Sequence, residues 1–209
     1  MFKSNLAVLN RKIDGGHAMK VVAINGSARN NGNTAILIRE VFKALEKEGI
    51  ETELIQLAGE RINSCIACYK CFANKNKRCA VDGDIVNECI KKMLTADGIM
   101  LGSPTYFADC SALLKTLIER VGMTSRANDD MFKRKVGAAV VAVRRGGAMH
   151  AFDSINHFFT IGQMIIVGSS YWNIGVGREI GEVETDTEGM QTMATLGKNM
   201  AWLLKKLHG

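Results

Sequence analysis

Four cysteines within one short segment are the residues of this sequence that point most directly to chemistry. They are Cys65, Cys68, Cys71 and Cys79, and they follow the pattern C-x2-C-x2-C-x7-C. Three thiolates at this tight spacing can each bind a different iron of a cubane cluster, and a fourth from slightly further along the chain completes the set. The segment therefore predicts a 4Fe–4S cluster with these four cysteines as its ligands.

Two alternatives stay open for the same segment. Zinc sites usually combine two C-x2-C pairs, whereas this segment holds a triplet and a single cysteine, so the spacing favours iron–sulfur over zinc. Four thiols without any metal are the second alternative. Cys89 and Cys110 lie on separate predicted helices, and we expect both to be buried thiols that bind no metal.

A second pattern is the loop 26–34 (GSARNNGNT), between a predicted strand and a predicted helix. Its small polar residues offer backbone N–H groups and short hydroxyls, and the helix adds its positive N-terminal end, so the loop favours a terminal phosphate. It contains neither Gly-Lys-Ser/Thr nor G-x-G-x-x-G, so neither a P-loop nor a dinucleotide fingerprint is indicated. An ordinary capped turn is the alternative.

Two further loops follow later predicted strands. The loop 103–107 (SPTYF) can offer backbone amides to the carbonyls and nitrogens of a planar ring, and its aromatic residues can pack on that ring. The loop 144–147 (RRGG) joins two cations, which suit an anionic reduced ring, to two glycines that permit close backbone approach. Taken singly, the loops also read as a strand end with core aromatics and as a solvated turn.

Alternating strands and helices must position these loops. Short apolar, β-branched runs predict strands at 20–25, 51–57, 97–102, 135–143 and 164–167. Apolar residues at helical spacing predict helices at 34–48, from Asp84 through Met93, and at 110–121, 152–162 and 187–207. A Cys-rich loop, 61–82, follows the second strand, and 168–181 is expected to be a Gly-rich irregular stretch.

This order predicts an α/β fold with a parallel sheet and helices on both faces. Five strands suit the flavodoxin-like, doubly wound arrangement in the order 2-1-3-4-5, in which ligands bind beyond the carboxyl ends of the strands. All three loops belong to that edge. We expect one domain at 19–209, preceded by an N-terminal extension at 1–18.

Composition narrows the class of protein further. The chain has 209 residues, 47% hydrophobic and 23% charged, as in ordinary soluble domains. No apolar run approaches the ~18 residues of a membrane span, so no membrane is expected. The net charge of +6 is scattered rather than grouped, so we expect no nucleic acid. No secretory signal is evident, and clustered cysteines suit a reducing compartment, which predicts a cytoplasmic protein.

The three loops together resemble those of the NADPH-dependent FMN reductase branch of the flavodoxin-like superfamily. The matching stretches are 26–34, 103–115 and 146–147, and the resemblance covers most of 19–207. The cysteine segment is similar to that of the iron–sulfur flavoproteins, a subfamily that carries a 4Fe–4S cluster beside FMN. Ala28 departs from the family, where Pro is frequent, and the gap before Cys79 lies at the long end of the subfamily's pattern.

The resemblance implies the cofactor and its contacts. It implies that the FMN phosphate lies on Ser27, Arg29, Asn31, Asn33 and Thr34. It implies that the isoalloxazine is held by Pro104, Thr105, Tyr106 and Phe107, with Gly146 and Gly147 nearby. It also implies a homodimer or homotetramer, in which the cluster of one subunit approaches the FMN of another.

These patterns predict an FMN-dependent oxidoreductase or electron-transfer flavoprotein with a 4Fe–4S cluster. Electrons would pass between NAD(P)H or a ferredoxin-like donor and an acceptor, and the cofactors supply the chemistry, so no side chain is predicted to be catalytic. One alternative is an NAD(P)H-dependent FMN, quinone or nitro-compound reductase whose Cys loop holds zinc or free thiols. An alternative of another class is a non-catalytic redox sensor or carrier.

Overall fold

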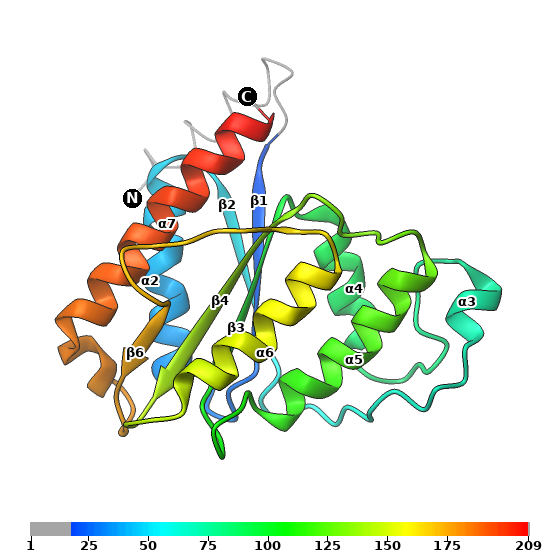
Figure 1. Ribbon diagram of the computed structural model, residues 1–209, viewed down its shortest axis with the longest axis horizontal. Helices are drawn as coiled ribbons and strands as arrows, with labels where there is room; N and C mark the ends of the chain where they lie inside the picture. Colours follow the sequence, from blue (N-terminus) through cyan, green and yellow to red (C-terminus); the bar gives the residue numbers. More distant parts are fainter. Residues whose placement is uncertain (1–17, 209) are drawn as a thin grey trace, which may run out of the picture.

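A parallel sheet forms the centre of the computed structural model, which describes residues 18–208 (Figure 1). Its strands are β1 (Lys20–Asn25), β2 (Glu51–Gln56), β3 (Gly98–Pro104), β4 (Val136–Val143), β5 (Ile165–Ile166) and β6 (Ile174–Val176). The strand order is β2-β1-β3-β4-β5, and β6 also pairs with β4. The flavodoxin-like order predicted from the sequence is confirmed.

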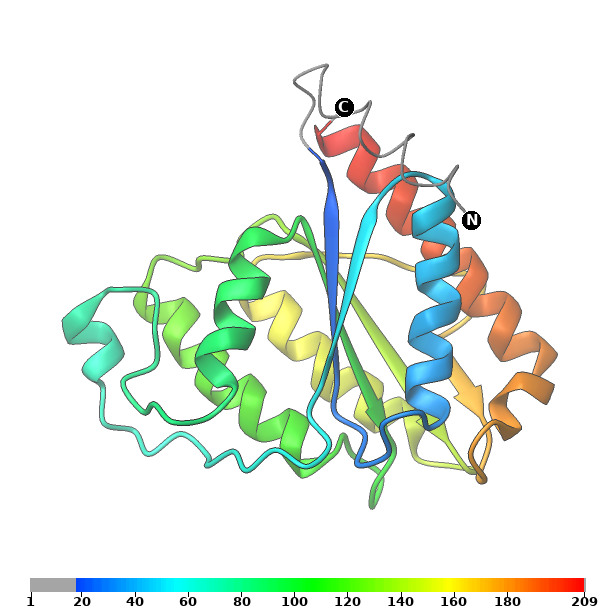
Figure 2. The ribbon, with the colours of Figure 1, turned by 180° about the vertical axis from the view of Figure 1, so that it is seen from behind.

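Helices cover both faces of this sheet. They are α2 (Asn33–Lys47), α3 (Lys70–Asn74), α4 (Val86–Thr95), α5 (Ala112–Ala127), α6 (Ala148–Ile161), the 3₁₀ turn η1 (Glu182–Thr185) and α7 (Thr187–His208). Figures 1 and 2 show α2 and α7 on one face and α4, α5 and α6 on the other. The short α3 lies beyond α5, away from the strands.

Each face of the sheet has its own hydrophobic core. Ile24 and Leu101 belong to the core beneath α4, α5 and α6. Ala23 and Met100, their neighbours in sequence, belong to the core beneath α2 and α7. Because successive strand residues point to opposite faces and both faces are covered, β1, β3 and β4 are almost continuously apolar.

The fifth strand differs from its prediction because it is split in two. β5 pairs with the first residues of β4, and β6 pairs with Val141, Ala142 and Val143 at its end. In the gap, Asn173 Nδ2 donates to the carbonyl of Ala139 at 3.0 Å, and Val141 N–H donates to the carbonyl of Asn173 at 2.9 Å. A buried amide side chain therefore replaces ladder bonds within the stretch predicted to be irregular.

Three helix boundaries also differ from the prediction. α6 begins at Ala148, directly after Gly147, which has φ of 86°. α5 begins at Ala112 and runs to Ala127, with the Ser111 hydroxyl accepting from Leu114 N–H at 3.2 Å. Cys110 therefore lies before this helix rather than on it. The short α3 within the Cys-rich loop was not predicted.

The predicted N-terminal extension, 1–18, lies outside the described residues except for Ala18. The domain boundary at residue 19 therefore stays a prediction. Within 18–208, none of the helices combines the length and the apolar character needed to cross a lipid bilayer.

Candidate functional site

The loop after β1 is held in place by polar contacts from β1 and β2. The buried Ser27 donates its backbone N–H to Asn25 Oδ1 at 2.9 Å. Gln56, the last residue of β2, donates from Nε2 to the carbonyl of Ser27 at 2.7 Å. Arg29 N–H donates to Ser27 Oγ at 3.1 Å. Asn25 and Gln56 thus shape the predicted phosphate loop, and no motif in the sequence singled them out.

The N-terminal end of α2 closes this loop. Gly32 is the N-cap, and no side chain of the described residues caps the helix there. Uncapped N–H groups in the first helical turn carry partial positive charge and suit an anion. Thr34 lies in this turn and is buried. It packs against Gly102 of β3, where an added Cβ would lie 3.0 Å from Thr34 Cγ2. The placement fits a terminal phosphate.

A fourth loop, 177–181, packs on the phosphate loop and was not anticipated. Asn33 Nδ2 donates to the carbonyl of Glu179 at 2.9 Å, and Asn33 Oδ1 accepts from Gly181 N–H at 2.9 Å. Arg29 Nη1 donates to the carbonyl of Arg178 at 3.1 Å. The side chain of Asn33 is therefore occupied in holding this loop. For the phosphate contact that the resemblance implies, Asn33 offers its backbone N–H at the start of α2. Asn31 is exposed, and its Oδ1 accepts from Arg39 at 2.8 Å.

The loop after β3 joins the phosphate loop at the same edge of the sheet (Figure 1). Gly26 N–H donates to the carbonyl of Gly102 at 2.8 Å, and Ser111 Oγ donates to the carbonyl of Gly26 at 2.7 Å. A Cβ added at Gly26 would lie 2.6 Å from Leu114 Cβ, so only glycine fits between these elements. The closeness of the two loops, expected from the parallel sheet, is confirmed.

The loop after β4 meets the loop after β3 from the other side. A Cβ added at Gly147 would lie 3.0 Å from Ala108 and 3.5 Å from Thr105 Cγ2. Phe107 and Ala108 have φ of 47° and 63°, which makes the turn tight. Pro104 ends β3, Tyr106 and Phe107 are exposed at the tip of this turn, and Arg144, Arg145 and Gly146 are exposed on the neighbouring loop.

Thr105 carries the clearest sign of a ligand at this edge. Its Oγ1 is buried and finds no hydrogen-bond partner among the described residues. A buried polar atom without a partner costs free energy unless water or a ligand satisfies it. With the uncapped start of α2 and the exposed aromatic turn, the residues present fit a flavin mononucleotide. The individual contacts with FMN stay a prediction.

The four clustered cysteines line one pocket. The lining comprises Cys65, Cys68, Cys71 and Cys79 together with Arg120, Met123, Thr124 and residues adjacent to the cysteines. Between the first and last cysteine, Ala67, Tyr69, Lys75 and Lys77 have positive φ although none is glycine. Strained backbone of this kind persists only where the surrounding structure imposes it, and it gathers at ligand sites.

Burial raises the pKa of thiols both inside and outside this pocket. Burial raises the pKa of the Cys71 thiol, and the neighbouring Cys79 and Cys65 thiols raise it further. Burial raises the pKa of Cys89 to about 12 and that of Cys110 to about 11. Neither Cys89 nor Cys110 lines the pocket.

The side chains that line this pocket are not arranged to bind a single metal ion. Within 18–208, no group of three His, Cys, Asp or Glu side chains is gathered closely enough to enclose one metal ion. A cubane places its four thiolates on four different irons, so its ligands lie further apart than those of a single ion.

The sheet order and the loops at its carboxyl edge define a flavodoxin-like flavoprotein. More particularly, this chain belongs to the NADPH-dependent FMN reductase family, whose family model matches residues 19–179. An FMN-dependent oxidoreductase is the activity that this membership supports.

Two relatives and one solved structure refine the comparison. An iron–sulfur flavoprotein of Methanocaldococcus jannaschii is 42% identical over 199 residues, which cover 90% of this chain and 98% of that protein. An iron–sulfur flavoprotein of Methanosarcina thermophila is 33% identical over 189 residues, which cover 90% and 96%. A WrbA-like flavodoxin from Agrobacterium tumefaciens matches with a TM-score of 0.63 at 14% identity, covering 92% of this chain and 100% of that one.

Proposed function

We propose that this protein is an FMN-dependent electron-transfer oxidoreductase whose clustered cysteines hold one 4Fe–4S cluster. The ligands are Cys65, Cys68, Cys71 and Cys79. The observation that carries the proposal is that these four side chains line a single pocket. The iron–sulfur flavoprotein relatives support it. Electrons pass between a reductant, either NAD(P)H or a ferredoxin-like donor, and an acceptor.

Different loops of the molecule bind the FMN phosphate, the flavin ring and the cluster. When bound, FMN supplies two-electron chemistry and the cluster one-electron chemistry, which lets one protein connect hydride donors with single-electron carriers. The start of α2 and the loop 26–34 bind the phosphate. The loops around Thr105 and Gly147 orient the ring, and the exposed side chains of Tyr106 and Phe107 on the same turn are available to pack against it. The cysteines hold the cluster away from the sheet.

Anaerobic analysis of iron, acid-labile sulfide and flavin in the purified protein tests this proposal. We expect one FMN and one 4Fe–4S cluster per chain. Replacing any of Cys65, Cys68, Cys71 or Cys79 by Ala should remove the cluster and leave FMN bound, because the flavin loops are separate elements. Cys89→Ala and Cys110→Ala are matched controls and should retain iron. Stoichiometric zinc without sulfide, or loss of iron from Cys110→Ala, would contradict the proposal.

Reduction by NADPH, NADH and a reduced ferredoxin, followed through the flavin absorbance, separates the remaining alternatives. Rapid turnover with a nicotinamide and an added acceptor is the result expected of an NAD(P)H-dependent reductase. Reduction by ferredoxin alone would identify the protein as an electron carrier linked to single-electron donors. Absence of turnover with every donor and acceptor would favour a redox sensor.

We further propose a homodimer or homotetramer. In Figure 1, α3 and the cysteine segment lie on the far side of α5 from β4 and α6. Tyr69 and Phe72, beside the cysteines, are 61% and 41% exposed, and their rings are 6.1 Å apart. Exposed aromatic pairs of this kind are typical of protein interfaces. Contact of this surface with the flavin-binding edge of another copy would bring the cluster of one subunit close to the FMN of the other.

A further inference from the structure

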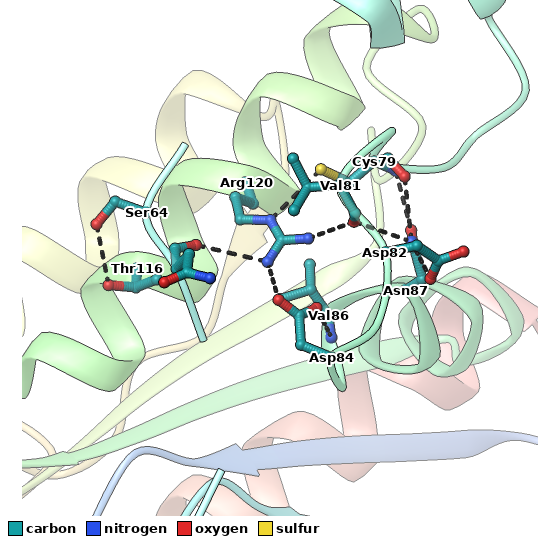
Figure 3. Close-up of polar contacts among 10 residues, drawn as sticks. Ser64, Cys79, Val81, Asp82, Asp84, Val86, Asn87, Thr116 and Arg120 are labelled. Carbon is teal, nitrogen blue, oxygen red and sulfur yellow. Dashed lines mark hydrogen bonds and ion pairs between the residues drawn. The ribbon is translucent and has the colours of Figure 1, made fainter. Parts of the chain in front are cut away.

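Arg120 has an environment that is unusual for an arginine. It lies on α5, its side chain is 0% exposed, and it reaches into the loop that carries Cys79 (Figure 3). Arginine is almost never fully buried unless its charge is paired. Here it forms an ion pair with Asp84, which is itself 7% exposed and accepts from Val86 N–H at 3.1 Å.

The remaining donors of this guanidinium bind both ends of the cysteine segment. Nη2 donates to the carbonyl of Val81 at 2.6 Å, and Nη1 approaches the carbonyl of Asn63 at 3.5 Å. Nε donates to Cys79 Sγ at 3.4 Å. Only the planar fork of arginine can serve these separate directions at once, because lysine presents a single ammonium.

The backbone of Cys79 is held from a second side. Asn87, on α4, accepts from Cys79 N–H at 2.9 Å and donates to the Cys79 carbonyl at 3.1 Å (Figure 3). The position of Cys79 is therefore determined by two helices. This isolated fourth cysteine is separated from the triplet by seven residues and is anchored by contacts that lie outside the segment.

We propose that Arg120 is a positioning residue that places Cys79 as the fourth cluster ligand and raises the reduction potential of the cluster through its Nε–H···Sγ hydrogen bond. The inference rests on the proposed function, since it requires the cluster. Reduction adds negative charge to the iron, sulfide and thiolate, so a hydrogen bond to a ligand sulfur stabilises the reduced form more than the oxidised form. The charge of the guanidinium is largely balanced by Asp84. The hydrogen bond to Cys79 Sγ is therefore the main contribution of Arg120 to the reduction potential.

Four variants separate the hydrogen bond from the charge. Arg120→Met removes both, Arg120→Lys keeps the charge but lacks Nε–H, and Asp84→Asn leaves the guanidinium unbalanced. The double variant Arg120→Met with Asp84→Asn removes the ion pair as a whole. The matched control is Arg126→Met on the same helix, which loses one exposed cation paired with Asp130 at 2.8 Å.

The measurement is an anaerobic redox titration of the cluster followed by electron paramagnetic resonance, with iron and sulfide analysis of each sample. We expect a lower potential in Arg120→Met and Arg120→Lys, a higher one in Asp84→Asn, and a wild-type value in Arg126→Met. The double variant should stay below wild type. We expect shifts of about tenfold in the reduction equilibrium, or about 59 mV for one electron.

The outcomes distinguish this inference from the proposed function. Wild-type protein without iron and sulfide would overturn the proposed function. Loaded variants with unchanged potentials, or a double variant equal to wild type, would overturn the role of Arg120 alone. If Arg120→Met does not load, Arg120→Lys and Asp84→Asn decide the question through their opposite shifts. Loss of iron from both Arg120 variants, with Arg126→Met fully loaded, supports the positioning role.

Discussion

Six thiols of this chain fall into two environments that differ in access to solvent. Cys68 is exposed and Cys65, Cys71 and Cys79 are partly buried, whereas Cys89 and Cys110 are buried. The thiolate is the reactive form of cysteine, so burial and a raised pKa both slow alkylation. The access to solvent that makes the four clustered cysteines available to a metal cluster therefore also makes them available to an alkylating reagent.

We expect iodoacetamide at pH 8 to label the four clustered cysteines of folded, reduced, metal-stripped protein. Cys71 should react more slowly than Cys68, because burial raises its pKa. Cys89 and Cys110, with pKa values of about 12 and 11, should stay unlabelled. Peptide mass spectrometry measures each site, and labelling in guanidinium chloride, where all six should react, is the control. Rapid labelling of Cys110 in folded protein would contradict the expectation.

The hydroxyls of the phosphate loop lead to a second prediction at this scale. Each hydrogen bond to a charged phosphate contributes roughly 1.5–3 kcal/mol, so replacing Ser27 and Thr34 together by Ala should weaken FMN binding by about a hundredfold or more. Flavin fluorescence titration of the apoprotein measures the affinity. Thr160→Ala, an exposed hydroxyl on α6, is the control. An unchanged affinity in the double variant would refute the assignment of this loop.

At the scale of elements, the start of α6 depends on one of two adjacent glycines. Gly147 has φ of 86°, and a Cβ there would lie 3.0 Å from Ala108, whereas a Cβ at Gly146 would meet no described atom within 4 Å. A left-handed conformation costs a non-glycine residue roughly 1–3 kcal/mol. Gly147→Ala should therefore lower the free energy of unfolding of the apoprotein by about 1–3 kcal/mol.

Gly146→Ala is the matched control for that experiment, and it should change the stability of the apoprotein by less than about 0.5 kcal/mol. Urea denaturation followed by circular dichroism measures both variants. Equal stabilities would contradict the account. Because Gly147 contacts the loop that contains Thr105, we also expect Gly147→Ala to weaken FMN binding.

At the scale of the whole molecule, the cysteine segment is expected at a subunit contact. Replacing Tyr69 and Phe72 together by Glu should lower the molar mass measured by light scattering, because two charges would enter an apolar contact. Trp202→Glu is the control, since Trp202 is 63% exposed on α7, on the other side of the molecule from α3. A wild-type protein that is monomeric with both cofactors bound would contradict the proposed assembly.

Patterns that depend on neighbouring residues were enough to predict much of this protein. Apolar runs such as 20–25 and 135–143 predict buried strands, and their alternation with helices predicts the sheet order and the edge at which the loops meet. The spacing of four cysteines predicts their grouping, because short loops keep such residues together. The fold class, the meeting of the three loops at one edge of the sheet and the grouping of the four cysteines were predictable for this reason.

Contacts between distant residues were decided only by the tertiary structure. Arg120 lies 41 residues from the cysteine whose sulfur it contacts, and Asn33 lies 146 residues from the Glu179 carbonyl that it binds. The split of the fifth strand depends likewise on Asn173 reaching Ala139 of β4. A polar side chain can satisfy its hydrogen bonds in many places, and its local sequence does not specify which. The partner is selected when two hydrophobic cores pack and bring remote backbone groups, otherwise unpaired and buried, within reach.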